Sequence, residues 1–237
     1  MPTIARKIKA LLEAAGKEEV RSMSPRFFKS GESVRLHGVR GGDVKKAMAL
    51  IMPLVAGMDK AAVFRECGEL WRSGYLEEGF AACELAYSRR HEYVPDDLSV
   101  FEHWLERHVD NWASCDTLCN HSIGALVTRY PATVDRLMEW TGAKNRWLRR
   151  GAAVSLIIPA RDGLFLPGIF AIADRLLTDA DDLVQKGYGW MLKAASEAHR
   201  DAVYDYVVGR KKVMPRTAYR YALEKMPADM RAVAMRK

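Results

Sequence analysis

The sequence lacks the features that would direct it into a membrane or out of the cell. It has no run of about 18 apolar residues, so no segment is long and apolar enough to cross a bilayer. The N-terminal MPTIARKIKALLEAAG has the apolar spacing of an amphipathic helix, not the continuous apolar core of a signal peptide, and an acidic KEEV follows it. We therefore expect a cytoplasmic protein with no membrane partner.

The sequence has few cysteines, and their spacing does not match a metal-binding motif. The sequence has no CxxC, and its cysteines are Cys67, Cys83, Cys115 and Cys119. Cys115 and Cys119 form a candidate ligand set with Asp116 and His121, but a single helix cannot easily wrap its side chains around one ion. Cytoplasmic cysteines stay reduced, so we expect small buried thiols. We expect neither a metal nor a cofactor.

Strand signals are almost absent, and helical periodicity takes their place. Short turns rich in Gly, Pro and Asp separate the helical segments, and we interpret Gly41-Gly42 as one such turn without the lysine spacing of a phosphate loop. The sequence is therefore predicted to be all-α. The predicted helices after the N-terminal one span residues 45–58, 62–74, 77–90, 98–109, 119–130, 132–142, 146–160, 166–179, 181–196, 201–212 and 216–226.

Small residues recur near helix starts, in GFAAC (79–83), RGAAV (150–154) and KGYGW (186–190). Gly151 and Gly187 are 36 residues apart, and Phe80 precedes Gly151 by 71, close to two such intervals. A degenerate period of about 36–40 residues with two helices in each repeat is typical of a HEAT-like solenoid. The small residues would let neighbouring helices approach closely.

This period predicts a HEAT-like helical-repeat solenoid, an α-α superhelix with one concave face. We expect one domain over residues 1–237, with N-terminal helices to about residue 40, degenerate repeats over about 41–227 and a basic tail over about 228–237. Asp116, Arg150 and Trp190 fall at comparable places on successive repeats, so we expect them to line the concave face.

Positive charge gathers near the C-terminus. Residues 210–237 contain nine Lys or Arg against two acids, an excess equal to the net charge of the whole chain, +7. Such a patch suits a polyanion such as nucleic acid. The alternative is a solvated tail that only keeps the protein soluble.

Residues 110–121, DNWASCDTLCNH, carry the most specific signal. In a helix, Trp112 and Asp116 lie one turn apart on the same face. Taken alone, Trp112 would more often be a core side chain and Asp116 a surface or capping acid. The alternative is that the two residues form one wall of an active site.

Four motifs in order resemble the AlkD-like family of DNA alkylation-repair glycosylases: WxxxD (112–116), WLRRGAAV (147–154), VQKGYGWMLK (184–193) and MPRTAYRYALEK (214–225). Members of this family are HEAT-like-repeat proteins that remove N3- and N7-alkylated purines. The similarity covers nearly the whole chain from about residue 17 onward.

The resemblance implies roles for particular residues. Trp112 and Trp190 match the tryptophans that flank the deoxyribose of the lesion, Asp116 matches the catalytic carboxylate, and Arg150 matches an arginine that contacts phosphate. Phe27 or Phe28 stands where the family often has an aromatic hydroxyl facing DNA. Further candidates for DNA contacts are Arg149, Lys186, Lys193, Arg216, Arg220 and, in the segment Gly38-Val39-Arg40, Arg40.

The expected chemistry follows from the charge of the lesion. An alkylated purine is cationic and already a good leaving group, so the enzyme needs chiefly to stabilise the oxocarbenium-like sugar and orient water, which Asp116 would do. Indole faces add cation–π attraction. No lysine nucleophile is evident, so we expect a monofunctional glycosylase of base excision repair. The resemblance also implies that the lesion stays largely stacked, so no base pocket is needed and bulky adducts are tolerated.

Two other functions remain open. One is a non-catalytic HEAT-like protein that binds damaged or branched DNA, and the other is a solenoid scaffold for other proteins. The presence of Asp116, Trp112 and Trp190 favours the enzyme, acting as a monomer on double-stranded DNA. Trp71, Trp104, Trp140 and Trp147 are assigned to helix packing, and the histidines (37, 91, 103, 108, 121 and 199) to structural or surface positions.

Overall fold

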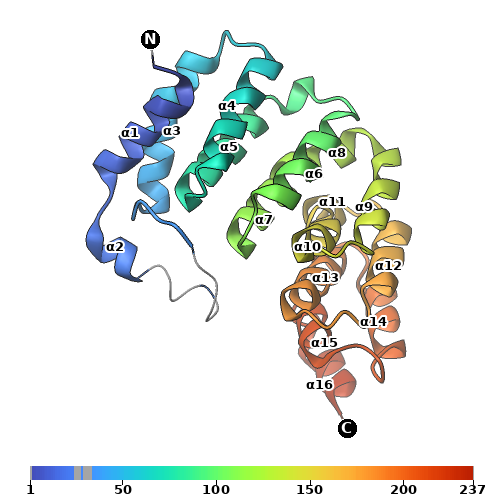
Figure 1. The fold of residues 1–237 in the computed structure, drawn as a ribbon. Coiled ribbons are helices and arrows are strands. Elements are labelled where there is room, and N and C mark those ends of the chain that lie inside the picture. The colour runs from blue at the N-terminus through green and yellow to red at the C-terminus, as the bar shows by residue number, and fades with distance from the viewer. Residues whose placement is uncertain (1, 24–27, 29–33, 237) are drawn as a thin grey trace. The chain divides into compact units, whose positions relative to one another are not determined.

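The computed structural model describes residues 2–23, 28 and 34–236. Throughout these ranges the regular elements are helices, apart from one isolated bridge between Arg35 and Tyr75 (Figure 1). The prediction of an all-α, helical-repeat protein is therefore confirmed. In the part of the chain that is described, no helix combines the length and the apolar character needed to span a bilayer. The chain divides into two compact units, residues 1–122 and 123–237.

The first unit is built from paired helices that bury an aromatic core. Helix α4 packs along α5, and α1 and α3 also contact α5. Phe64, Phe101 and Trp104 meet at centroid distances of 5.6–5.7 Å, and Tyr93 joins them. The helices are α1 (Ile4–Ala15), α2 (Glu18–Met23), α3 (Gly41–Val55), α4 (Lys60–Arg72), α5 (Leu76–Ser88), α6 (Asp97–Arg107) and α7 (Trp112–Leu118).

The second unit is organised around α13 (Asp182–Ala195), which packs against α10, α11, α12 and α15. Val184, Tyr188, Met191 and Ala195 recur every three or four residues and are fully buried, as expected of a central helix. The other helices are α8 (Gly124–Arg129), α9 (Val134–Trp140), α10 (Arg146–Val154), α11 (Ile157–Arg161), α12 (Leu166–Arg175), α14 (Arg200–Gly209), α15 (Arg216–Ala222) and α16 (Ala228–Met235).

Three predicted boundaries were wrong. Gly41-Gly42 is not a turn but the start of α3, which follows the extended backbone of Arg40 and has Asp43 in its first turn, where an acid favours the helix dipole. Residues 119–130 do not form one α-helix, because a π-helical turn (Cys119–Ile123) precedes α8. Residues 146–160 form two helices, since α10 ends at Val154 and α11 begins at Ile157. Within 228–237, α16 occupies Ala228–Met235.

Small residues allow close helix packing, as their recurrence predicted. A Cβ on Gly79 would lie 2.9 Å from the Trp71 ring, and one on Gly187 would lie 3.2 Å from Cγ of Arg150. Gly189 is the tightest of these three glycines, because its added Cβ would lie 2.8 Å from Cβ of Tyr221 and 2.9 Å from the carbonyl oxygen of Ala218. The close contact between α13 and α15 therefore requires glycine at position 189.

Replacing Gly189 by alanine should lower the free energy of unfolding by about 1–3 kcal/mol, because the new methyl group meets backbone that cannot rotate away. Chemical denaturation monitored by circular dichroism measures the change. Gly68→Ala in α4 is the matched control, since nothing lies within 4 Å of the added Cβ. That control should be stabilised by about 0.5–1 kcal/mol through helix propensity. Equal effects of the two substitutions would contradict this description of the packing.

Candidate functional site

The candidate catalytic pair lies on α7, at the start of that helix. The side chain of Asn111 caps the helix by accepting from the backbone N–H of Ser114 at 2.9 Å. Trp112 is the first residue of α7, so Asp116 follows one helical turn later on the same face. Asp116 is only 8% exposed. The structure thus confirms that the two residues share one helix, with the carboxyl group largely shielded from water.

The tryptophans divide into two groups. Trp71, Trp104, Trp140 and Trp147 are buried, which confirms their assignment to packing. The other two of the six, the candidate-site residues Trp112 and Trp190, are both partly exposed. An indole that is held by a helix yet partly open to solvent is able to contact a ligand. The phenyl ring of Phe28 lies 6.0 Å from the Trp112 ring, whereas Phe27 lies outside the described residues.

A pair of buried glutamates holds the segment that leads into α3. The carboxylate of Glu77 accepts from the backbone N–H groups of His37 (3.0 Å), Gly38 (2.9 Å) and Val39 (3.0 Å). Glu78 contacts Nε2 of His37 at 2.7 Å. Gly38 has φ +84°, and a Cβ there would lie 2.5 Å from the carbonyl oxygen of Lys17. The segment around Gly38 and Val39 is therefore held in place by the carboxylate groups of Glu77 and Glu78 and by the left-handed backbone conformation of Gly38.

Sequence reasoning missed these glutamates. Two acids in the first turn of a helix normally lie in water and favour the helix dipole. Here both are buried, and their partners are about 40 residues away in the sequence. The backbone N–H groups of His37, Gly38 and Val39 account for the burial of Glu77, and the imidazole of His37 accounts for that of Glu78. Arg40, the last residue of this segment, stays exposed and pairs with Glu19 at 3.1 Å.

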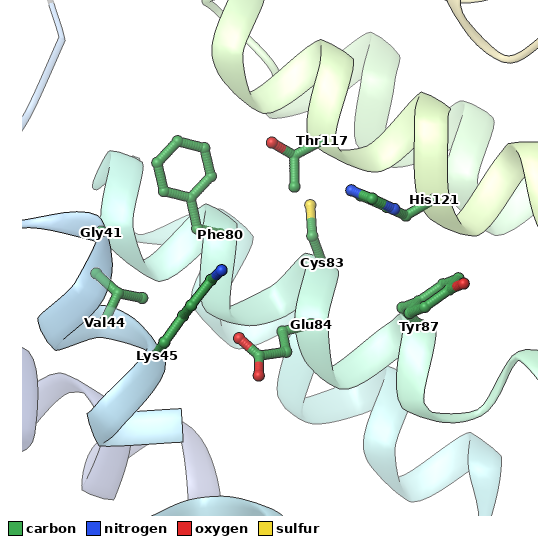
Figure 2. A pocket seen from close by; sticks show the side chains of 9 residues that line it. All are labelled: Gly41, Val44, Lys45, Phe80, Cys83, Glu84, Tyr87, Thr117 and His121. Atoms are coloured by element: carbon green, nitrogen blue, oxygen red, sulfur yellow. The ribbon is translucent and has the colours of Figure 1, made fainter. Parts of the chain in front are cut away.

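A pocket of about 340 Å³ lies within the first unit, lined by residues of α3, α5, α7 and the π-helical turn (Figure 2). Val44 of α3 and Cys83 of α5 are buried in its wall, and Phe80 and Tyr87 of α5 are partly exposed along it. Thr117, the residue after Asp116, closes the side formed by α7. The remaining polar side chains at the rim are those of Lys45, Glu84 and His121.

No pattern in the sequence predicted this pocket. Phe80, Cys83, Glu84 and Tyr87 follow the i, i+3, i+4, i+7 spacing, which indicates the core-facing side of a helix. The exposed Glu84 on this face was the one departure from that pattern. From the sequence alone, His121 is a candidate metal ligand that we assign to a structural or surface position. It lies in the π-helical turn and its ring is 5.5 Å from the ring of Tyr87.

In the second unit, the two neighbouring arginines of α10 are held by internal contacts. Arg150 is only 5% exposed, and its guanidinium donates to the carbonyl oxygen of Leu183. Nε of Arg149 lies 2.6 Å from the carboxylate of Asp179, and its Nη1 donates to two backbone carbonyls at 2.9 Å. Both side chains therefore stabilise the packing of α10, whatever else they contact.

The four other basic candidates in this unit differ in their contacts. Lys186 lies 3.5 Å from Asp182, and Lys193 lies 3.0 Å from Glu224. Arg216 and Arg220 of α15 are exposed, and no ion pair joins either of them to another described residue. Among these four, the two arginines are the most available to an anionic partner.

Comparison with known proteins agrees with the all-helical fold. Residues 8–226 match the family described as DNA alkylation repair enzyme. A solved structure of a predicted DNA alkylation repair enzyme from Enterococcus faecalis is similar, with a TM-score of 0.80 and 15% identity, over 90% of this chain and 97% of that chain. At that identity the likeness establishes the fold alone. No curated protein matches the sequence significantly.

Proposed function

This chain belongs to the family of DNA alkylation repair enzymes, and from that premise we propose that it is a monofunctional DNA glycosylase. Its substrate would be duplex DNA that carries N3- or N7-alkylated purines, and the bond hydrolysed would be the N-glycosidic bond. The observation that carries the proposal is Asp116, a largely buried carboxyl group one helical turn from the partly exposed indole of Trp112.

The chemistry requires little of the protein beyond electrostatics. As the glycosidic bond breaks, its electron pair passes to the cationic purine, which leaves as a neutral base. Positive charge develops on the sugar at C1′, where the carboxylate of Asp116 stabilises it. Water then adds its oxygen to C1′ and releases a proton, leaving an abasic site. The indole of Trp112 adds cation–π attraction of about 0.5–2 kcal/mol to the developing charge. The same role for Trp190, which belongs to the second unit, rests on the family resemblance alone.

The direct test measures base release and DNA binding in parallel on the same methylated duplex. We expect free 7-methylguanine to accumulate with time and protein concentration. Release of bulky N3 or N7 adducts is a second arm, which tests whether large substituents are tolerated. Tight binding without release of any alkylated base would favour the alternative of a non-catalytic protein that binds damaged DNA.

DNA binding by the proposed enzyme should weaken steeply as salt rises, because each neutralised phosphate releases counterions. Replacing both Arg216 and Arg220 by alanine should lower affinity and reduce the slope of log affinity against log salt by about 2. Fluorescence anisotropy over a salt series measures both quantities. Arg72→Ala, which removes an exposed arginine paired with Glu69, is the matched control and should leave the slope unchanged. A flat salt dependence of the wild type would indicate a protein scaffold instead.

A further inference from the structure

Asn111 immediately precedes the helix that carries the candidate catalytic pair, and it is only 2% exposed. We infer that Asn111 is a positioning residue, whose side chain fixes the first turn of α7 and with it the place of the Trp112 indole. The inference rests on the proposed glycosylase function. It adds a residue that acts through Trp112 and does not itself touch the substrate.

The side-chain amide of Asn111 is engaged at both of its ends. Its Oδ1 accepts from the backbone N–H of Ser114 at 2.9 Å, which pairs one of the N–H groups that every helix start leaves without an internal partner. Its Nδ2 donates to Oγ of Ser114 at 3.2 Å and to the carboxylate of Asp110 at 2.8 Å. These hydrogen bonds hold the capping side chain in one rotamer, so the start of α7 has one defined geometry.

The cap is attached to the core of the first unit. Ser114 is buried, and a Cβ placed on Gly79 of α5 would lie 3.5 Å from its Oγ. Further along α7, Cys115 and Leu118 are fully buried. Core packing therefore secures the middle of the helix, whereas the partly exposed Trp112 occupies its first position, where the cap acts.

The first turn of α7 depends strongly on its cap, because the helix has only seven residues. Short helices are marginal by themselves, and helix ends fray first. Without the cap the first turn would open and displace the indole of Trp112. Asp116, one turn further along among buried neighbours, would stay in place. Catalytic contributions are sensitive to displacements of about 1 Å, so the loss would fall on the rate of reaction.

The test measures single-turnover release of 7-methylguanine at saturating protein, together with DNA binding, for Asn111→Ala. Release should slow about tenfold, because the displaced indole no longer stabilises the developing charge. Binding should stay within about twofold of wild type, since phosphate contacts supply most of the affinity. Asn111→Ser provides another capping oxygen and should restore most of the rate.

Asp59→Ala is the matched control. The carboxylate of Asp59 caps α4 by accepting from the backbone N–H of Ala62 at 2.6 Å, and α4 carries no candidate site residue. Loss of either cap should lower the stability to denaturant, because both remove the partner of a helix-start N–H group. Only Asn111→Ala should slow base release, whereas a purely structural role would make the two variants behave alike.

A second measurement follows the position of Trp112 without any chemistry. In protein made with fluorinated tryptophan, the fluorine NMR signal that disappears in Trp112→Phe belongs to Trp112. This signal should shift in Asn111→Ala and return in Asn111→Ser. The signal of Trp190, which belongs to the second unit, should stay in place.

The outcomes separate this inference from the proposed function. Wild-type release by Asn111→Ala, an equal loss of release in Asp59→Ala, or an unchanged Trp112 signal would overturn the positioning role. Base release by the wild type would in that case leave the glycosylase intact. No release by the wild type, with a Trp112 signal that still follows the Asn111 substitutions, would contradict the glycosylase and uphold the effect of the cap on the indole.

Discussion

Replacing Asp116 by asparagine should slow base release by about 10²–10³-fold, a loss typical of removing one preorganised electrostatic group. Asparagine keeps the size of the side chain, so α7 and its capping by Asn111 are retained. Binding to methylated duplex DNA should therefore change little, because phosphate contacts supply most of the affinity. Single-turnover release of 7-methylguanine, with binding measured on the same protein, separates the two effects.

Asp110→Asn is the matched control for this substitution. Asp110 precedes the same helix and is exposed, and its carboxylate accepts from the side-chain amide of Asn111 at 2.8 Å. Its replacement should leave base release within about twofold of wild type, since surface substitutions seldom change stability by more than about 0.5 kcal/mol. If Asp116→Asn retained wild-type release, the carboxylate would have no part in the reaction.

Replacing Glu77 by alanine should lower the free energy of unfolding by about 3 kcal/mol. The substitution leaves three backbone N–H groups without their buried acceptor, and each unpaired donor carries a desolvation cost. Glu77→Gln retains one acceptor oxygen and should be destabilised less. Denaturant unfolding followed by circular dichroism measures both losses.

The control for this prediction is Glu13→Ala, which removes an exposed glutamate 3.8 Å from Lys9. Exposed pairs of this kind contribute about 0–1 kcal/mol. Its unfolding curve should therefore nearly overlay that of the wild type. A Glu77→Ala protein as stable as the control would show that the segment at His37–Val39 is held by other contacts.

Much of the fold was predictable because apolar residues that recur every three or four positions mark the buried side of a helix. Apolar spacing predicted a helix over residues 181–196, where α13 lies, and the small residues near helix starts predicted close packing. The four packing tryptophans were also identified correctly. Buried thiols were expected and found, since Cys67, Cys83, Cys115 and Cys119 are all buried and none of these four forms a disulfide. In each case a local pattern determines which side of a helix meets the core.

The features that were missed depend on partners far apart in the sequence. Glu77 resembles an ordinary first-turn acid until its backbone partners near Gly38 are known. In the sequence, Arg149 and Arg150 look like solvent-exposed basic residues. In the structure, Arg149 pairs with Asp179 and Arg150 donates to the carbonyl oxygen of Leu183. The α5 residues that line the pocket have the spacing of core residues. That side of α5 is partly open only because of where α3 and α7 pack beside it. The π-helical turn changes the phase of the helix at Cys119 without any sequence signal.

A duplex with one 7-methylguanine at a defined position distinguishes hydrolysis of the glycosidic bond from binding alone. Wild-type protein in excess should release the free base in a single exponential phase, and each release should leave one alkali-labile abasic site in the DNA. Equal yields of base and abasic site would show hydrolysis by water. DNA that stays bound and intact at the lesion, with no base released above the spontaneous rate, would contradict the account.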